Sequence, residues 1–288
     1  MEKVFLCLDV GGTEIKAAPV DGRGALLRPL RRFPARAGEP AAALLEHFAS
    51  VIGETGAGLP DAAGVRFAFP GPFDYENGVC LLRGLSKFDS LYGLNLRSSL
   101  SARLGVEPGR IRFANDAAAF ALGEMGFGCA AGASRALFVC IGTGCGSAFG
   151  VGGRLAAEGT PGVPENGYIY SAPYLDGCID DYISRRGLME LSLERMGESL
   201  DGRALAQRAM EGDARAAGCF LAFGERLRDA LSPFLTGFAP ELVCLGGQIM
   251  KSAPLFLPPL REACRRLGIE LAVTDDTSVR ALQGLTRI

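Results

Sequence analysis

The segment LCLDVGGTEIK, from Leu6 to Lys16, constrains the fold more than any other part of the chain. Its apolar run has the density of a buried strand, and it carries Asp9 directly into two glycines, a hydroxyl and a lysine. Glycines permit a tight reversal in which backbone amides lie against an anion. We expect Gly11, Gly12 and Thr13 to bind phosphate, and Asp9 to hold Mg²⁺ through the waters that this ion retains. The alternative on these residues alone is a Gly-Gly hairpin turn with an aspartate at the strand end.

Two further glycine-rich turns follow apolar strands later in the chain. The first, in ALFVCIGTGCG (136–146), offers consecutive N–H groups and a hydroxyl, and predicts nucleotide contacts at Thr143, Gly144 and Gly146. The second, in ELVCLGGQIM (241–250), contains Gly246 and Gly247, where an adenosine can lie on backbone without interference from a Cβ atom. The sequence contains neither a P-loop nor a Rossmann fingerprint. The turns therefore predict one nucleotide held between two halves of duplicated architecture.

Strand and helix signals alternate along the chain. We expect strands at 3–9, 15–20, 65–69, 111–115, 136–141, 146–151, 241–245 and 270–273, and helices at 41–53, 94–104, about 178–232 and from near 278. A strand, helix, strand order predicts parallel strands in an α/β fold. The sequence contains no tandem short repeat and no composition typical of a disordered linker.

Taken in order, DVGGTEIK, ANDAAAFALGE (114–124), IGTGCGSAFG and LGGQI resemble the motifs of the ROK family of sugar kinases, within the superfamily of sugar kinases, Hsp70 and actin ATPases. The resemblance covers nearly the whole chain. It implies an α/β, two-lobed ribonuclease H-like or actin-like ATPase fold, with mixed sheets flanked by helices and a central cleft. The implied lobes are residues 1–115, with a helix at about 275–288 packing back on them, and residues 116–274.

Asp116 is the expected catalytic residue, because phosphoryl transfer needs a sugar hydroxyl that is oriented in line and relieved of its proton. It follows a predicted strand and stands beside Asn115. The alternative is that Asn115 or Asp116 caps the next helix, and both roles can hold together. The resemblance implies that Asn115, Asp116 and Glu165 bind the sugar, and that the loop from Gly84 to Asp89 lines it.

The sequence departs from the family where relatives usually carry E-x-G-H followed by C-x-C-G-x-x-G-C-x-E, a zinc-binding stretch. Tyr168 replaces the histidine, Ser171 and Pro173 replace two thiolates, and only Cys178 remains. One thiolate cannot hold tetrahedral zinc, so we expect no structural zinc. Tyr168 and Asp180, which is one methylene shorter than the family's glutamate, are expected to bind the sugar. The alternative for Asp180 is an ordinary acidic first turn of a helix.

Composition agrees with a soluble, two-lobed enzyme. A net charge of −2 does not indicate a positively charged surface that would attract nucleic acid, nor a cluster of basic residues that would bind a membrane. No apolar run approaches the roughly 20 residues that span a bilayer. The nine cysteines are odd in number and scattered, which is typical of reduced core residues. We expect a cytoplasmic protein, and whether it forms a homodimer stays open.

These observations predict a glucokinase-like enzyme that uses ATP and Mg²⁺ to phosphorylate a hexose hydroxyl. One alternative is a non-catalytic sugar-binding or regulatory protein, since relatives include repressors. Those carry an added N-terminal helix-turn-helix, for which we expect no room before the turn that begins near residue 9. Another alternative is a kinase that uses polyphosphate as donor, although the LGGQI turn favours adenosine.

Overall fold

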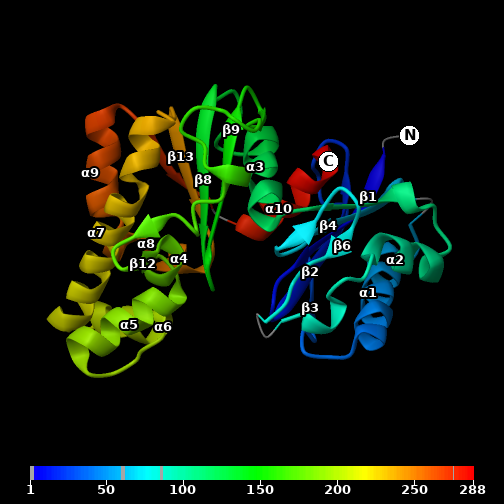
Figure 1. Cartoon of the computed structure of the whole chain (residues 1–288), viewed down its shortest axis with the longest axis horizontal. Helices are drawn as coiled ribbons and strands as arrows, with labels where there is room; N and C mark the ends of the chain where they lie inside the picture. Colours follow the sequence, from blue (N-terminus) through cyan, green and yellow to red (C-terminus); the bar gives the residue numbers. More distant parts are fainter. Residues whose placement is uncertain (1–2, 60–61, 85–86, 275) are drawn as a thin grey trace. The chain divides into compact units, whose positions relative to one another are not determined.

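The computed structural model describes residues 3–59, 62–84, 87–274 and 276–288. Contacts between residues divide the chain into two compact units (Figure 1). Unit 1 comprises residues 1–128 and 278–288, and unit 2 comprises residues 129–277. The chain therefore passes from unit 1 to unit 2 after Gly128 and returns after Thr277.

Unit 1 is built on a five-stranded sheet with the order β3-β2-β1-β4-β7. Its strands are β1 (Val4–Val10), β2 (Glu14–Asp21), β3 (Arg31–Pro34), β4 (Gly64–Ala68) and β7 (Ile111–Ala114). β1 and β2 form an antiparallel hairpin, while β1, β4 and β7 are mutually parallel. The carboxyl ends of these three strands therefore lie at one edge of the sheet.

Helices cover both faces of the unit 1 sheet. On one face, α1 (Ala41–Gly56) and α2 (Leu96–Leu104) enclose an apolar core that includes the fully buried rings of Phe48 and Phe69. On the other face lie α3 (Asp116–Phe127), α10 (Thr277–Gly284) and the 3₁₀ turn η5 (Leu285–Arg287), against Phe5 and Cys7 of β1. Burial on both faces explains why β1 is a nearly continuous apolar run.

Helices α3 and α10 touch through glycines. A Cβ atom on Gly123 would overlap the carbonyl group of Arg280, and one on Gly284 would overlap the carbonyl oxygen of Ala119. Glu124, which is buried, also pairs with Arg280, with 3.5 Å between Oε1 and Nε. The C-terminal helix α10 thus packs against α3 in unit 1.

Unit 2 repeats the topology of unit 1, with the strand order β10-β9-β8-β13-β14. Its strands are β8 (Arg135–Ile141), β9 (Cys145–Val151), β10 (Arg154–Leu155), β13 (Leu242–Gly246) and β14 (Glu270–Val273). β8 and β9 form the antiparallel hairpin, and β8, β13 and β14 are parallel. The predicted duplication is therefore confirmed at the level of strand order and direction.

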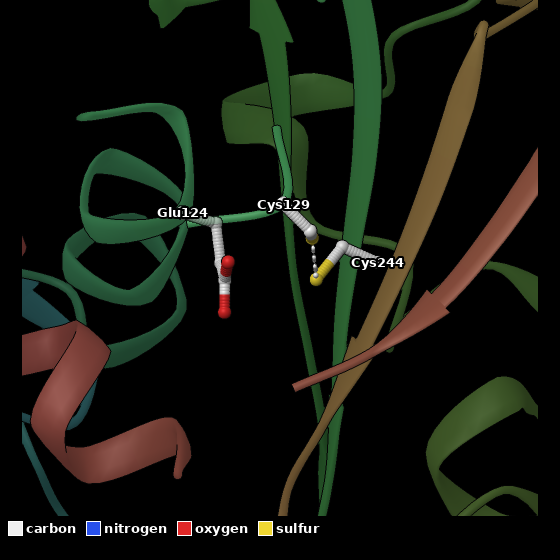
Figure 2. A group of neighbouring side chains, drawn as sticks. All are labelled: Glu124, Cys129 and Cys244. Carbon is white, nitrogen blue, oxygen red and sulfur yellow. Dashed lines mark hydrogen bonds between the residues drawn. The ribbon is translucent and has the colours of Figure 1, made fainter. Parts of the chain in front are cut away.

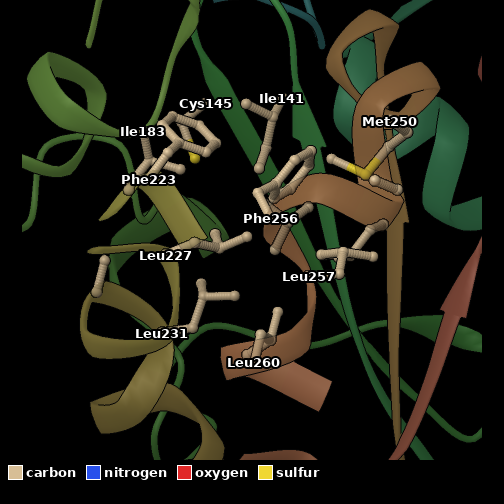
Figure 3. Close-up of a cluster of buried hydrophobic side chains, with 14 of the residues drawn as sticks. Ile141, Cys145, Ile183, Phe223, Leu227, Leu231, Met250, Phe256, Leu257 and Leu260 are labelled. Atoms are coloured by element: carbon tan, nitrogen blue, oxygen red, sulfur yellow. The ribbon is translucent and has the colours of Figure 1, made fainter. Parts of the chain in front are cut away.

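A large apolar core covers one face of the unit 2 sheet. It lies between β8, β9 and β13 and a layer of helices: α5 (Arg185–Met196), α6 (Gly202–Met210), α7 (Ala214–Gly237), α8 (Ala253–Phe256) and α9 (Pro258–Leu267). Figure 3 shows Ile141 and Cys145 of the sheet facing Phe223 of α7 and Phe256 of α8. This core fixes the strand ends that carry the glycine turns of unit 2.

Short elements complete the two units. They are β5 (Phe73–Asp74), β6 (Val79–Cys80), η1 (Asp89–Leu91) and η2 (Pro108–Arg110) in unit 1, and η3 (Glu165–Gly167), β11 (Pro173–Tyr174), β12 (Gly177–Cys178), α4 (Ile179–Tyr182) and η4 (Gln248–Ser252) in unit 2. No helix within the described residues is both long enough and apolar enough to cross a membrane.

The expected strands are present within one or two residues of their predicted bounds, and the expected helical region at 178–232 consists of the four helices α4 to α7. The observed division differs from the expected lobes in the position of α3, which groups with unit 1 because Ala119 packs into the core of that unit. The assignment of residues 1–115 and 116–274 to two lobes stays a prediction.

Candidate functional site

The turn between β1 and β2 is closed by its own backbone. The Gly11 amide donates to the Glu14 carbonyl at 2.9 Å, and a Cβ on Gly11 would lie 3.1 Å from that oxygen. Thr13 is tied to the next segment, because its carbonyl accepts from the Ala35 amide at 2.9 Å. Gly12 and Thr13 therefore form a narrow tip of backbone and hydroxyl donors, an arrangement suited to an anion.

Asp9 and Lys16 face each other across the β1–β2 hairpin. They are paired in register, and the Lys16 Nζ lies 4.0 Å from the Asp9 Oδ2. The ammonium also donates to the Ser278 hydroxyl at 2.6 Å, and the side chains of Lys16 and Asp9 are only 16% and 18% exposed. Lys16 is therefore not a solvated surface residue, and it holds the carboxylate beside the turn. A carboxylate there fits a contact to hydrated Mg²⁺.

Asn115 and Asp116 follow β7 at the same sheet edge. The Asn115 Oδ1 caps α3 by accepting from the amides of Ala117 and Ala118 at 2.9 and 3.3 Å. Its Nδ2 donates to the Tyr75 hydroxyl at 3.2 Å, and the Asn115 side chain also hydrogen-bonds the Asp116 carboxyl group. Asn115 thus performs the expected capping role, and Asp116 is the first residue of the helix.

The surroundings of the Asp116 carboxyl group shift its pKa. Its Oδ1 accepts from the Ala117 amide at 2.9 Å. Surrounding protein raises the pKa of Asp116 above that of a free aspartate, although the Ala117 amide and the positive charge of Lys87 act in the opposite direction. The residue as a whole nevertheless keeps part of its surface exposed to solvent. A reachable carboxylate with a raised pKa suits a group that accepts a proton.

Lys87 of unit 1 lies beside the β1–β2 turn, called here the phosphate turn, and acts electrostatically on Asp116. A Cβ on Gly12 would lie 3.4 Å from Cδ of Lys87, so the lysine stem runs along the turn, while its charge acts on the Asp116 carboxyl group. The sequence alone favours a solvated loop charge for this residue. Leu85 and Ser86, within the predicted sugar-lining loop from Gly84 to Asp89, lie outside the described residues.

In unit 2, the turn between β8 and β9 is held on both sides. The Gly142 amide donates to the Gly144 carbonyl at 2.9 Å, and the Gly142 carbonyl accepts from the Arg185 amide at 2.8 Å. The Cys145 amide donates to Oδ1 of Asp180 at 2.7 Å. Thr143 and Gly144 therefore form the tip of the turn.

Gly146 lies one step beyond that tip. It is inside β9, where it pairs with Cys140 of β8. Gly146 therefore differs from Thr143 and Gly144, which lie at the tip of the turn, although the sequence predicts nucleotide contacts for all three residues.

The turn after β13 lies beside the β8–β9 turn. Gly246 pairs with Cys140, and Gly247 has a φ of 100°. A Cβ on Gly247 would overlap the Ile141 carbonyl oxygen, so only glycine fits both this conformation and this approach. The Gly247 amide donates to the Thr277 hydroxyl at 2.7 Å, a partner that the sequence did not indicate.

The loop that contains Glu165 and Tyr168 is organised by Ser147. This buried hydroxyl donates to the Gly167 carbonyl at 2.6 Å and accepts from the Ile169 amide at 2.9 Å. Glu165 is exposed in η3, and Tyr168 is half-buried. Ser147 is a supporting residue that no motif in the sequence marked.

The segment of this chain that corresponds to the zinc-binding stretch of relatives lacks the side chains that would bind zinc. Cys178 donates its thiol hydrogen to Oδ2 of Asp181 at 3.0 Å, and Pro173 pairs with Cys178 in the β11–β12 hairpin. A serine, a proline and a tyrosine cannot supply the nitrogen and sulfur ligands that complete a tetrahedral set. The residues present do not fit structural zinc, and the absence of this metal stays a prediction.

The structure thus gathers the predicted site residues into two groups, one in each unit. Unit 1 brings together, at the carboxyl edge of its sheet, Asp9, Gly11, Gly12, Thr13, Asn115 and Asp116, with Lys16 and Lys87 added. Unit 2 brings together Thr143, Gly144, Gly246, Gly247 and Asp180. That both groups bind one nucleotide stays a prediction.

Comparisons with known proteins agree with this architecture. The sequence model of the ROK family matches residues 5–281. A glucokinase from Thermotoga maritima is 28% identical over 88% of this chain and 85% of its own, and an N-acetyl-D-glucosamine kinase from Aliivibrio fischeri is 29% identical over 85% and 84%. The crystal structure of a ROK hexokinase from Thermus thermophilus matches with a TM-score of 0.81 and 25% identity, covering 99% of this chain and 97% of that one. The predicted actin-like ATPase fold is confirmed by this likeness.

Proposed function

Because this chain belongs to the ROK family, we propose that it transfers the γ-phosphoryl group of ATP to a hydroxyl of glucose or a related hexose. The observation that carries the proposal is the arrangement at the start of α3. Asn115 caps the helix, so Asp116 is not needed as its cap, and Asp116 is an exposed residue whose carboxyl group has a raised pKa. The glucokinase and N-acetyl-D-glucosamine kinase relatives support a sugar as the acceptor.

In this proposal, Asp116 is the general base that receives the proton of the sugar hydroxyl as the new bond forms. A base within hydrogen-bond reach contributes about 10²–10⁴ to the rate. Asn115 of unit 1 and Glu165 and Tyr168 of unit 2 are the proposed sugar contacts. Polar groups of this kind select among sugar hydroxyls by their geometry.

The nucleotide contacts are assigned to the glycine turns. Gly11, Gly12 and Thr13, together with Thr143 and Gly144, are proposed to bind the phosphates. Gly246 and Gly247 are proposed to accommodate the adenosine, and Asp9 to hold Mg²⁺ through its waters. This ion would neutralise charge on the phosphates. Lys87 is added as a cation beside the phosphate turn.

A coupled assay of ADP release tests the proposal. The purified protein is supplied with ATP, Mg²⁺ and, one at a time, a panel of hexoses and N-acetylhexosamines, and the sugar phosphate is identified by mass spectrometry. We expect ADP release that depends on at least one sugar. Binding of nucleotide without turnover on any sugar would instead indicate a sugar-sensing protein. Thermal protection by polyphosphate but not by ATP would reassign the donor.

Asp180 is given a different role from the one that the resemblance implies. Its Oδ1 accepts from the Cys145 amide, its Oδ2 lies 3.6 Å from Nη2 of Arg186, and a Cβ on Gly144 would lie 2.7 Å from Oδ1. These contacts place its carboxylate against the β8–β9 turn. We therefore propose that Asp180 is a positioning residue for the β8–β9 turn.

The Asp180→Ala variant is expected to raise the KM for ATP about tenfold and to leave the KM for the sugar nearly unchanged, because a charge-assisted hydrogen bond to the turn contributes roughly 1.5–3 kcal/mol. Steady-state kinetics with each substrate varied in turn provide the measurement. Asp181→Ala is the matched control, since that carboxylate shares Arg186 with Asp180 but bonds to Cys178 and not to the Cys145 amide of the turn. A rise confined to the KM for the sugar would return Asp180 to the role of sugar contact.

A further inference from the structure

Two thiols of unit 2 lie unusually close together. Cys129 stands in the segment that follows α3, and Cys244 lies in β13, the strand between β8 and β14. Their sulfur atoms are 3.2 Å apart, and Figure 2 shows the two side chains directed toward each other. A disulfide needs a separation of about 2.05 Å, so the sulfurs have to approach by only roughly 1 Å.

The two thiols also differ in access to solvent. Cys129 is exposed, whereas Cys244 is fully buried. A soluble oxidant therefore reaches Cys129, while the Cys244 thiol lies within reach of the Cys129 sulfur. One exposed thiol beside a second thiol is the arrangement of cysteines that are oxidised reversibly.

Three other cysteines of the chain have surroundings that suppress reactivity. Burial raises the pKa of the Cys7 and Cys145 thiols far above the usual range, and raises that of Cys264 to about 11. These thiols stay protonated near neutral pH, and the thiolate is the reactive form. The nine cysteines all lie in the described ranges, and none of them forms a disulfide there.

We propose that Cys129 and Cys244 form a reversible disulfide when the protein meets a peroxide. The Cys129 sulfur attacks one oxygen of hydrogen peroxide, whose O–O bond breaks, giving a sulfenic acid at Cys129 and one water. The Cys244 sulfur then attacks the sulfenic sulfur, the S–O bond breaks, and a second water leaves with the remaining thiol hydrogen. The two thiols supply the two electrons that reduce the peroxide, and a dithiol reductant reverses the bond.

The disulfide would tie the segment after α3 to the middle of the unit 2 sheet. Cys244 lies two residues before Gly246, so the crosslink ends close to the turn assigned to adenosine. It also closes a long loop of chain, from residue 129 to residue 244. Closing a long loop stabilises the folded state by constraining the unfolded chain, so we expect the oxidised protein to melt roughly 5 °C or more above the reduced protein.

Mass spectrometry and thermal melting test this proposal on the full chain. The protein is treated with hydrogen peroxide, remaining thiols are alkylated, and the digest is searched for a peptide pair joined through Cys129 and Cys244. We expect this pair, a mass lower by two hydrogen atoms, protection of Cys129 from alkylation, and reversal by dithiothreitol. The expected rise in Tm should be reversed by the same treatment.

Cys129→Ser removes an exposed thiol and should fold normally, so it serves as the principal variant. It should form no intramolecular disulfide and show no rise in Tm with peroxide, whereas Cys178→Ser, which removes a half-buried thiol elsewhere in unit 2, should behave as the unmodified chain does. Irreversible oxidation of Cys129 to the sulfinic acid, or a disulfide between two copies of the chain through Cys129, would overturn the proposal. So would a Tm rise that persists in Cys129→Ser.

Discussion

The Asp116→Asn variant is expected to lose a factor of about 10²–10⁴ in kcat, which corresponds to roughly 2.7–5.5 kcal/mol in the barrier. Asparagine has nearly the shape of aspartate, and its Oδ1 can still accept from the Ala117 amide as Asp116 does. Asn115 continues to cap α3. The change therefore removes the proton acceptor and leaves the local fold in place, so the loss should appear in kcat and not in the KM for the sugar.

Three measurements separate a chemical defect from a folding defect in Asp116→Asn. The Tm should stay within a few degrees of that of the unmodified chain, calorimetry should give a similar Kd for the sugar, and rapid-quench kinetics should show the loss in the phosphoryl transfer step. Glu54→Gln is the matched control, because it neutralises an exposed carboxylate on α1 of the same unit and should retain full activity. A folded, sugar-binding Asp116→Asn enzyme that works at the native rate would remove Asp116 from the role of base.

Features that depend on short stretches of sequence could be predicted. The strands β1 and β13 are recognisable because burial on both faces demands uninterrupted apolar residues, and the turns after them because Gly11 and Gly247 make close backbone approaches that leave little or no room for a Cβ. The duplication follows, since the same strand and turn signal occurs in both halves. Asn115 as a helix cap was also predictable, because the capping residue lies directly before the helix.

Features that depend on contacts between distant residues could not be predicted in this way. Thr277 accepts a hydrogen bond from Gly247, thirty residues earlier, and Asp180 accepts one from Cys145, thirty-five residues earlier. No spacing rule connects such pairs, because each partner is supplied by a different element of the fold. The grouping of α3 with unit 1 is of the same kind, since it depends on Ala119 packing against a sheet and not on any property of the helix itself.

Lys87 provides the second large expected effect, and it too follows from a tertiary contact. Its stem lies against Gly12, and its charge lowers the pKa of the Asp116 carboxyl. A cation between a phosphate turn and a base can stabilise the negative charge of the transferring phosphoryl group, and the removal of one such donor costs about 10²–10³ in rate. Lys87→Met keeps the apolar stem and removes the charge, so we expect kcat to fall by about 10²-fold.

The pH dependence of kcat distinguishes this role of Lys87 from a purely structural one. Because the Lys87 charge lowers the pKa of Asp116, its loss raises that pKa further, and a higher pH is then needed to ionise the base. The acid limb of the kcat profile should therefore move to higher pH in Lys87→Met, an effect that a packing defect would not produce. Arg83→Met is the matched control, since this cation is exposed and lies over the Tyr92 ring, 5.3 Å from its centroid. An unchanged kcat with an unshifted acid limb in Lys87→Met would show that the lysine is only a solvated loop charge, and that Asp116 acts without it.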